Sequence, residues 1–322
     1  MRLSIVVPTY NRPELLGRCA AALIAQDLDL RAFEIIIADD AASEATRAQV
    51  EAIAAQAPVP VYHVPVTGRH GPAAARNAGW RSARGEVIAF TDDDTIPDSS
   101  WAAAGLGALE RDPTIAAATG RTEVPLPRRP TDYERNESGL ATAEFITANC
   151  FIRRSVLEAV HGFDERFRVA WREDSDLHFA LLERGLKIIK APAAAVIHPV
   201  RPAPWGVSLR QQRKNQYDAL LYKKHPVLYR RKIPPGRPWD YYLIVASIII
   251  AAVGLAIGST WLALAASLAW LAFTGRFLLR RLRGCTLAPA HIAEMLATSA
   301  LIPPLSLYWR FYGAVRFRTW FI

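Results

Sequence analysis

The chain has 322 residues, of which 51% are hydrophobic and 21% charged, and this excludes a disordered or collagen-like protein. Its formal net charge of +9 is unevenly distributed. Residues 1–197 carry 22 Lys and Arg against 27 Asp and Glu (−5), residues 198–240 carry 10 against 2 (+8), and residues 241–322 carry 7 against 1 (+6). A nucleic-acid binder with a wholly basic body is therefore excluded. The charge pattern predicts a basic collar beside an anionic surface such as membrane lipids.

The three cysteines, Cys19, Cys150 and Cys285, lie far apart and form no Cys-x-x-Cys pair. An odd, scattered set is typical of a reducing compartment rather than of a disulfide framework. The first apolar run covers only residues 3–7, which is too short for the core of a signal peptide. We therefore expect the N-terminal part of the protein to lie in the cytoplasm.

Short apolar runs alternate with segments of helical periodicity along the first two hundred residues. The expected strands are residues 3–7, 34–38, 59–64, 86–90 and 194–197, and the expected helices are residues 13–25, 43–55, 72–83 and 177–183. Asn11 and Ser43 are the expected N-caps of the first two helices. This alternation predicts an α/β fold with a mostly parallel, doubly wound sheet, in which ligands bind beyond the carboxyl ends of the strands.

Polar clusters follow three of the expected strands, at residues 8–12, 39–40 and 92–94. The last of them is three adjacent carboxylates, Asp92, Asp93 and Asp94, which raise one another's pKa unless a cation lies among them. Mg²⁺ or Mn²⁺ is the natural partner of such oxygen ligands, and either ion also binds a diphosphate. The alternative is a solvated acidic turn that caps the following helix.

Further along the chain, His70-Gly71-Pro72 opens a helix that carries Arg76 and Asn77, and these residues offer backbone N–H groups and a guanidinium to a phosphate or a base. Residues 171–177 contain Glu173 and Asp174 at the start of a helix, where they act either as ordinary caps or as a general base near the metal. His198 ends a strand, as the acidic clusters do.

Together these segments resemble the family 2 glycosyltransferases with the GT-A (Rossmann-like) fold over about residues 1–230. The matching motifs are VVPTYNRPELL at 6–16, EIIIADDAA at 34–42, GPAAARNAG at 71–79, GEVIAFTDDD at 85–94, HGFDE at 161–165 and WREDSDL at 171–177. Two departures from the family stand out. The usual DDGS is Asp39-Asp40-Ala41-Ala42 here, and the QxxRW signature of polymer-extruding synthases is absent, with QQRK at 211–214 in its place.

The resemblance implies roles for individual positions. The nucleotide-sugar donor would be bound by Pro8, Thr9, Tyr10, Asn11, Arg12, Asp40, Arg76, Asn77, Asp92 and Asp93. Asp92 and Asp94 match the two acids of the DxD motif, and His198 lies where some GT-A enzymes have a third metal ligand. Asp174 matches the second acid of the ED motif, which is the general base in inverting members.

The implied function is the inverting, metal-dependent transfer of one sugar from a nucleotide-diphosphate sugar to a hydroxyl of a lipid-linked or glycan acceptor in cell-envelope polysaccharide synthesis. A polyprenyl-phosphate glycosyltransferase is the alternative, but its acceptor is already anionic and needs no base, whereas the Glu173-Asp174 pair offers one. A membrane-anchored nucleotide-binding scaffold without turnover is less favoured, because a scaffold needs neither acidic cluster.

Residues 241–275 contain no charge, and a single helix of that length would measure about 52 Å, more than the roughly 30 Å of a bilayer core. We expect two spans, at about 241–257 and 261–279, joined by a turn at 258–260. Basic residues flank them: Lys223, Lys224, Arg230, Arg231, Lys232 and Arg237 before, and Arg276, Arg280, Arg281 and Arg283 after. The positive-inside rule then places both ends in the cytoplasm.

The expected organisation has three parts. Residues 1–230 form the GT-A domain, residues 231–283 the basic collar and two transmembrane helices, and residues 284–322 an apolar re-entrant or interfacial segment with a basic C-terminus. Within the last part, residues 287–309 contain Pro303-Pro304 and precede three arginines, which argues against a third full span. The expected location is the inner (plasma) membrane, multi-pass, with the catalytic domain on its cytoplasmic face.

Overall fold

The computed structural model describes residues 1–233 and 239–320, and the chain divides into two compact units. The sheet unit consists of Met1–Pro125 and Ser138–Val200. The helical unit consists of Leu126–Glu137 and the chain from Arg201 onward. Packing thus divides the chain at Val200, whereas composition placed a boundary near residue 230. Arg237, one of the flanking basic residues, lies outside the described residues.

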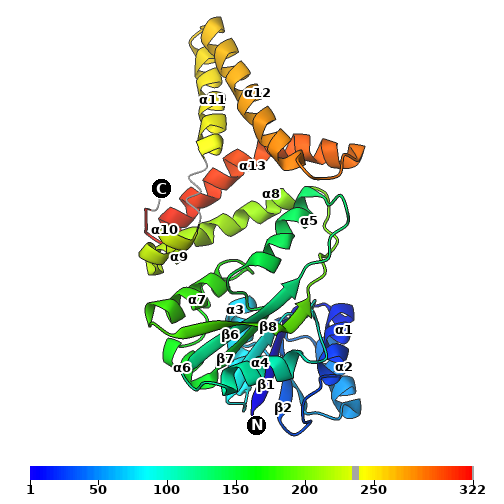
Figure 1. Ribbon diagram of the computed structural model, residues 1–322. Helices are drawn as coiled ribbons and strands as arrows, with labels where there is room; N and C mark the ends of the chain where they lie inside the picture. The colour runs from blue at the N-terminus through cyan, green and yellow to red at the C-terminus, as the bar shows by residue number, and fades with distance from the viewer. Residues whose placement is uncertain (234–238, 321–322) are drawn as a thin grey trace. The chain divides into compact units, whose positions relative to one another are not determined.

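The described strands of the sheet unit form one sheet in the order β3-β2-β1-β4-β7-β6-β8-β5 (Figure 1). The strands are β1 (Leu3–Thr9), β2 (Phe33–Asp39), β3 (Val61–Pro65), β4 (Val87–Thr91), β5 (Ile96–Pro97), β6 (Ile115–Glu123), β7 (Asn149–Arg153) and β8 (Lys187–Ile197). The first four pair in parallel, as the alternating pattern predicts. β7 instead runs antiparallel to both β4 and β6, while β6 and β8 pair in parallel. The sheet is therefore mixed, with four of its seven described strand pairings parallel.

Helices cover both faces of this sheet. They are α1 (Pro13–Ile24), α2 (Glu44–Gln56), α3 (Pro72–Ser82), α4 (Trp101–Glu110), α6 (Arg154–Val160) and α7 (Glu173–Glu183). Successive side chains of a strand point to opposite faces. Accordingly, Ile5 packs in the core with residues of α1, α2 and α4, whereas its neighbour Val6 packs in the second core with residues of α3, α6 and α7. Both cores are needed, because every strand residue from Leu3 to Val7 is buried.

The two expected N-caps have different outcomes. The Ser43 side chain accepts a hydrogen bond from the Thr46 amide, which confirms it as the cap of α2. The prediction for Asn11 is wrong, because the residue before α1 is Arg12 and it makes no side-chain capping bond. Asn11 has a φ of 52° instead, in the left-handed region that Asn tolerates better than most residues. Its place is therefore in the turn that follows β1.

The helical unit contains α5 (Asp132–Glu137), α8 (Val207–Gln211), α9 (Gln216–Lys224), α10 (Pro226–Lys232), α11 (Trp239–Ala256), α12 (Thr260–Leu282) and α13 (Pro289–Arg316). Among the described residues, α11 and α12 are the two helices long and apolar enough to cross a membrane, with mean hydropathies of 1.8 and 1.7. They form the hairpin in Figure 1, and Gly258 in the turn between them has a φ of 73°. α13 is one continuous helix that includes Pro303 and Pro304.

Arg281 shows how the helical unit is held together. The positive-inside argument treats it as a surface charge, but its side chain is buried. It donates to Asp132 Oδ2 from Nε and Nη2, at 3.0 and 2.8 Å, and to the hydroxyl groups of Thr298 and Ser299 at 2.7 and 3.1 Å. One guanidinium thus connects α12 with α5 and α13, and its donors meet acceptors in a fixed planar geometry.

The tight packing of α4 on the sheet predicts opposite effects for two glycines of this helix. A Cβ at Gly105 would overlap the Phe151 ring, whereas a Cβ at Gly107 would meet no described atom within 4 Å. We expect Gly105→Ala to destabilise the protein by about 1–3 kcal/mol through overpacking. Gly107→Ala should stabilise it by roughly 0.5–1 kcal/mol, because alanine loses less entropy in a helix. Thermal unfolding of the two variants in detergent measures both effects, and equal shifts would contradict the packing argument.

Candidate active site

The acidic loop after β4 is a tight turn held by its own hydroxyl groups. The Thr95 amide and hydroxyl both donate to the Asp92 carbonyl oxygen, at 3.2 and 2.8 Å. The Thr95 hydroxyl also lies 2.6 Å from that of Thr91, the last residue of the strand. These bonds direct the backbone sharply away from β4. The following carboxylates therefore lie beyond the carboxyl end of the sheet, where ligands bind in folds of this type.

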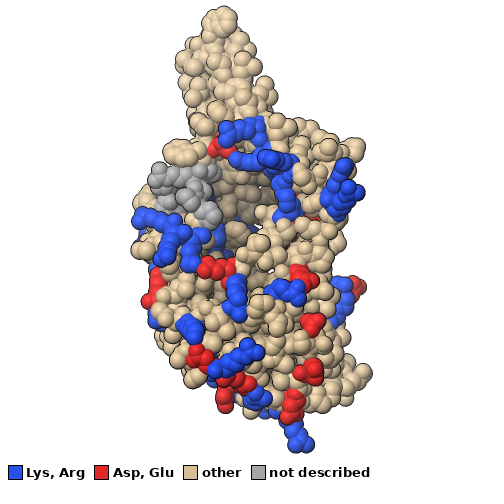
Figure 2. All heavy atoms as spheres, in the orientation of Figure 1, with Lys and Arg blue, Asp and Glu red and all other residues tan. Residues whose placement is uncertain are grey.

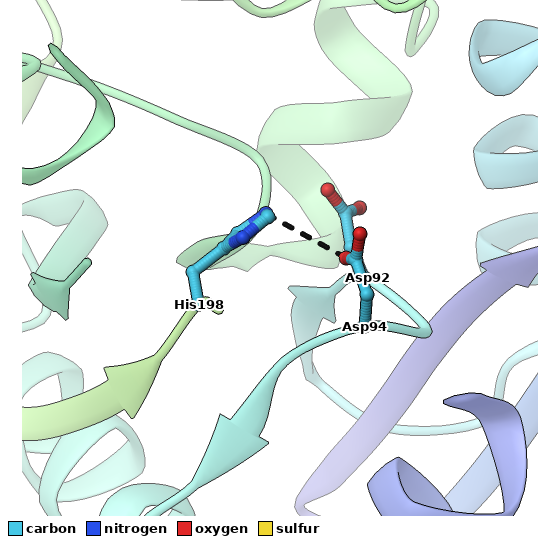
Figure 3. Close-up of side chains that lie close together, drawn as sticks. All are labelled: Asp92, Asp94 and His198. Carbon is cyan, nitrogen blue, oxygen red and sulfur yellow. Dashed lines mark ion pairs between the residues drawn. The ribbon is translucent and has the colours of Figure 1, made fainter. Parts of the chain in front are cut away.

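Asp92, Asp94 and His198 converge as expected, although the strands that carry them are not neighbours. One ligand atom from each side chain lies within 4.8 Å of the other two. Figure 3 shows the imidazole directed at the two carboxylates, with His198 Nε2 3.6 Å from Asp94 Oδ1. The His198 amide donates to Glu123 O at 2.7 Å, which fixes the end of β8. Two carboxylates and an imidazole are a donor set that suits a divalent ion such as Mn²⁺ or Mg²⁺.

Asp93, a predicted donor contact, has partners within the protein. Its carboxylate is nearly fully buried, and it accepts one hydrogen bond from the Thr9 hydroxyl at 2.8 Å and one from Arg12 at 3.0 Å. Burial raises the pKa of Asp93, while the Arg12 guanidinium opposes that shift. This carboxylate therefore connects the ends of β1 and β4, and the donor contact of Asp93 stays a prediction. Thr9 and Arg12, also predicted donor contacts, are its partners.

Arg76 lies between the acidic loop, which carries Asp92 and Asp94, and helix α7. Its guanidinium is buried, and it donates to Asp92 Oδ1 at 2.8 Å and to Glu173 Oε1 at 3.1 Å. A cation in this position balances carboxylates that would otherwise repel one another. Sequence reasoning assigned Arg76 to phosphate or base. The structure gives it two carboxylate partners within the protein, and it thereby connects the acidic loop to α7.

The two acids at the start of α7 have different surroundings. Glu173 is buried against Arg76, and its second oxygen, Oε2, has no hydrogen-bond partner among the residues that the structure describes. Asp174 is only partly buried, and its Oδ1 accepts from the Ser175 amide at 2.6 Å. Burial and the Asp174 carboxylate raise the pKa of Glu173 to about 7. Burial also raises the pKa of Asp174.

Asn77, another predicted donor contact, is bonded through both ends of its carboxamide within the protein. Its amide nitrogen donates to the Phe163 carbonyl oxygen and to Glu165, at 2.8 and 2.9 Å. Its carbonyl oxygen accepts from the Phe163 amide and from the Trp80 indole, at 2.9 and 2.8 Å. All four hydrogen-bonding positions of the carboxamide are thus used inside the protein. Asn77 thus holds the loop at 163–165 against α3, and its donor contact stays a prediction.

The remaining predicted donor residues lie at the ends of β1 and β2. Asp40 accepts the Gly71 amide with both carboxylate oxygens, at 2.9 and 3.0 Å, and this connects the end of β2 to the start of α3. Pro8 lies in β1 opposite Ala38, while Tyr10 and Asn11 follow it and are exposed. The three strand ends therefore meet at one edge, as expected. The sequence analysis missed Glu173 as the partner of Arg76. The only feature that pointed to Glu173 was its position next to Asp174.

A search of solved structures shows the class of this fold. The mannosyltransferase PcManGT from Pyrobaculum calidifontis, solved in complex with GDP-Man and Mn²⁺, superposes with a TM-score of 0.56 at 20% identity, covering 98% of this chain and 87% of that one. The sheet unit thus has the GT-A glycosyltransferase fold.

Family models and curated relatives give the narrower assignment. "Glycosyl transferase family 2" matches residues 4–161, and "Glycosyl transferase family group 2" matches residues 131–312. The chain therefore belongs to the family 2 glycosyltransferases. It is 28% identical over 300 residues to the pre-mycofactocin glycosyltransferase of Mycobacterium tuberculosis, covering 87% of this chain but 58% of that one. It is 25% identical over 224 residues to glycosyltransferase AglE of Haloferax volcanii, covering 65% of this chain and 70% of that one.

A shorter match concerns a relative whose name includes a lipid carrier. The GalNAc(5)-diNAcBac-PP-undecaprenol beta-1,3-glucosyltransferase of Campylobacter jejuni is 33% identical over 93 residues, which is 29% of each chain. The present chain spans only about three fifths (58%) of the length of the mycobacterial relative.

The raised pKa of Glu173 predicts how stability depends on pH. A carboxyl group with a folded pKa near 7 and an ordinary value of 4.5 binds its proton more tightly in the folded state. Stability should therefore fall as pH rises from about 4.5 to about 7. Glu173→Gln keeps the shape and cannot ionise, so its melting temperature should depend less on pH in this range. Glu51→Gln, at an exposed glutamate, should keep the wild-type slope. Melting curves recorded with a chelator test this, and an unchanged slope in Glu173→Gln would contradict it.

Proposed function

We propose that this protein transfers one sugar from a nucleotide-diphosphate sugar to a hydroxyl group of its acceptor, with inversion at the anomeric carbon. The observation that carries the proposal is the connection made by Arg76. On one side it contacts Asp92 of the acidic cluster, and on the other it contacts α7, where Asp174 follows Glu173 directly. Groups suited to hold a leaving diphosphate and a group suited to accept a proton therefore lie in one site.

On the donor side, Asp92, Asp94 and His198 would hold a divalent ion, Mg²⁺ or Mn²⁺. Such an ion supplies positive charge to the departing diphosphate when it is bound. Asp40 and the turn at residues 8–12, with Tyr10 exposed, would contact the nucleoside. The GDP-Man and Mn²⁺ bound by the Pyrobaculum enzyme support this arrangement.

On the acceptor side, Asp174 would remove the proton of the attacking hydroxyl group. Its raised pKa brings the carboxylate closer to the working pH, where a general base accepts a proton most effectively. The Ser175 amide fixes one of its oxygens and so orients the carboxylate. Glu173 is committed to Arg76 and is not available for this step.

We further propose a lipid-linked or glycan acceptor at the cytoplasmic face of the inner (plasma) membrane. The hairpin of α11 and α12 could span a bilayer, and Figure 2 shows its far end free of charged side chains, with basic residues beginning at its base. A nucleotide-sugar donor is made in the cytoplasm, so the sheet unit would face that side. The undecaprenol-linked substrate in the name of the Campylobacter relative supports this acceptor class.

Loss of one metal ligand tests the donor side. Asp94→Asn removes a charged ligand, and we expect Mn²⁺ affinity and sugar transfer to fall by at least about 100-fold, since even indirect contacts to a metal contribute 10–100-fold. Asp98→Asn is the matched control, because this exposed aspartate lies nearby but outside the cluster. Mn²⁺ titration by electron paramagnetic resonance gives the affinity. Near wild-type turnover in Asp94→Asn, with Mg²⁺ or Mn²⁺ present, would show that the metal assignment is wrong.

Asp174→Asn tests the acceptor side. Removing a general base typically lowers kcat by about 10²–10⁴-fold, and we expect that loss with nearly unchanged donor affinity. Donor binding is measured by thermal shift with the nucleotide sugar that stabilises the wild type most. Unchanged kcat would favour the alternative, a polyprenyl-phosphate acceptor that needs no base. Loss of donor binding would move Asp174 to the donor side of the site.

A further inference from the structure

Helix α13 has one face that the rest of the helical unit does not cover. Its buried side chains include Thr298, Ile302 and Ser306. The side chains on the opposite face recur at spacings of three, four and seven residues, and they are large, apolar or aromatic, and 41–68% exposed: Leu301, Tyr308, Phe311, Tyr312 and Val315. We call these five residues the outer face of α13.

The charged residues of this part of α13 lie outside its outer face. Arg310 is mostly buried and lies 3.7 Å from Asp218 of α9. Arg316 donates to the Gln216 side chain at 2.7 Å. With about 100° of rotation per residue, Arg310 points away from the outer face, and Arg316, which is exposed, follows the last residue of that face. From Leu301 to Val315 the outer face is therefore uncharged.

The contacts of α13 within the helical unit place it at the base of the hairpin. Ile302 packs in one cluster with Ile244 of α11 and Phe277 of α12. Both partners lie within about two turns of the charged end of the hairpin, where Arg280 donates to Asp240 at 2.7 Å. An ion pair of this kind marks the depth at which hydrocarbon gives way to headgroups. α13 therefore meets the hairpin at that depth.

We propose that the outer face of α13 lies on the lipid surface, parallel to the membrane plane, at the level of the headgroups. This inference rests on the proposed membrane placement of the hairpin. α13 packs against α11 and α12 through Ile302, and both of these helices also expose large apolar side chains. Tyrosine side chains are favoured at the boundary between acyl chains and water. The covered side of α13 carries buried polar side chains as well as Ile302, with Thr298 and Ser299 bonded to Arg281, which suits an in-plane helix rather than a third span.

The test uses fluorophores on single introduced cysteines of the full-length protein in liposomes. The native cysteines are buried, so a maleimide dye should react preferentially at exposed Phe311→Cys or Val315→Cys. Ile250→Cys in α11 and Leu30→Cys in the sheet unit, both exposed, are the matched controls. The liposomes contain lipids brominated either near the headgroup or near the end of the acyl chain. Bromine quenches a dye only at close range.

We expect dyes at positions 311 and 315 to lose more fluorescence with lipids brominated near the headgroup, and a dye at 250 to lose more with lipids brominated near the chain end. A dye at 30 should be quenched by neither. Stronger quenching of 311 and 315 by the deep label would make α13 a third span and overturn the inference. No quenching there would also overturn it, as would energy transfer between differently labelled copies at those positions in place of lipid quenching. If the dye at 250 is unquenched too, the membrane placement of the hairpin itself fails.

Discussion

The site depends on one buried guanidinium. Four acidic side chains, at positions 92, 94, 173 and 174, gather beyond the carboxyl end of the sheet, and Arg76 contacts one of them on each side, Asp92 and Glu173. Buried carboxylates repel one another, so this cation is what lets the loop after β4 lie close to α7. Leaving either carboxylate without it would cost several kcal/mol, as for any broken buried ion pair. The distance between the acidic loop and α7 is thus set from inside the protein.

A consistent division of roles follows within the acidic segments. In the triplet, Asp93 is buried and bonded to Thr9 and Arg12, while Asp92 and Asp94 face His198. In the α7 pair, Glu173 is bonded to Arg76, while Asp174 remains partly accessible. One carboxylate of each segment therefore contributes to the structure and positions its neighbour. Runs of acids at strand ends and helix starts thus contain both the candidate reactive groups and the groups that orient them.

The sequence predicted the part of this arrangement that depends on local pattern. Strands β1 to β4 and the helices between them follow from periodicity. Parallel strands bring their carboxyl ends to one edge, so the convergence of the acidic loop with His198 could be predicted from the sequence. β6 and the antiparallel strand β7 were missed, and Asn149–Arg153 is short and separated from β6 by a long excursion of the chain. The partners of Asp93 and the partners of Asn77 in the loop at 163–165 were also missed, since they lie 81 to 88 positions away along the chain. No spacing rule reaches that far.

The same limit applies to the helical unit. Charge counting found the basic flank of α12 but treated Arg281 as one surface arginine among several. Its partner Asp132 belongs to Leu126–Glu137, a segment that leaves the sheet unit after β6 and returns to it before β7. The chain therefore passes between the two units three times rather than once. A buried, bidentate ion pair at the end of an apolar helix requires a fixed acidic partner. A segment that is joined to the sheet unit at both ends has less conformational freedom than a free tail. Ordering it to present Asp132 therefore costs less entropy.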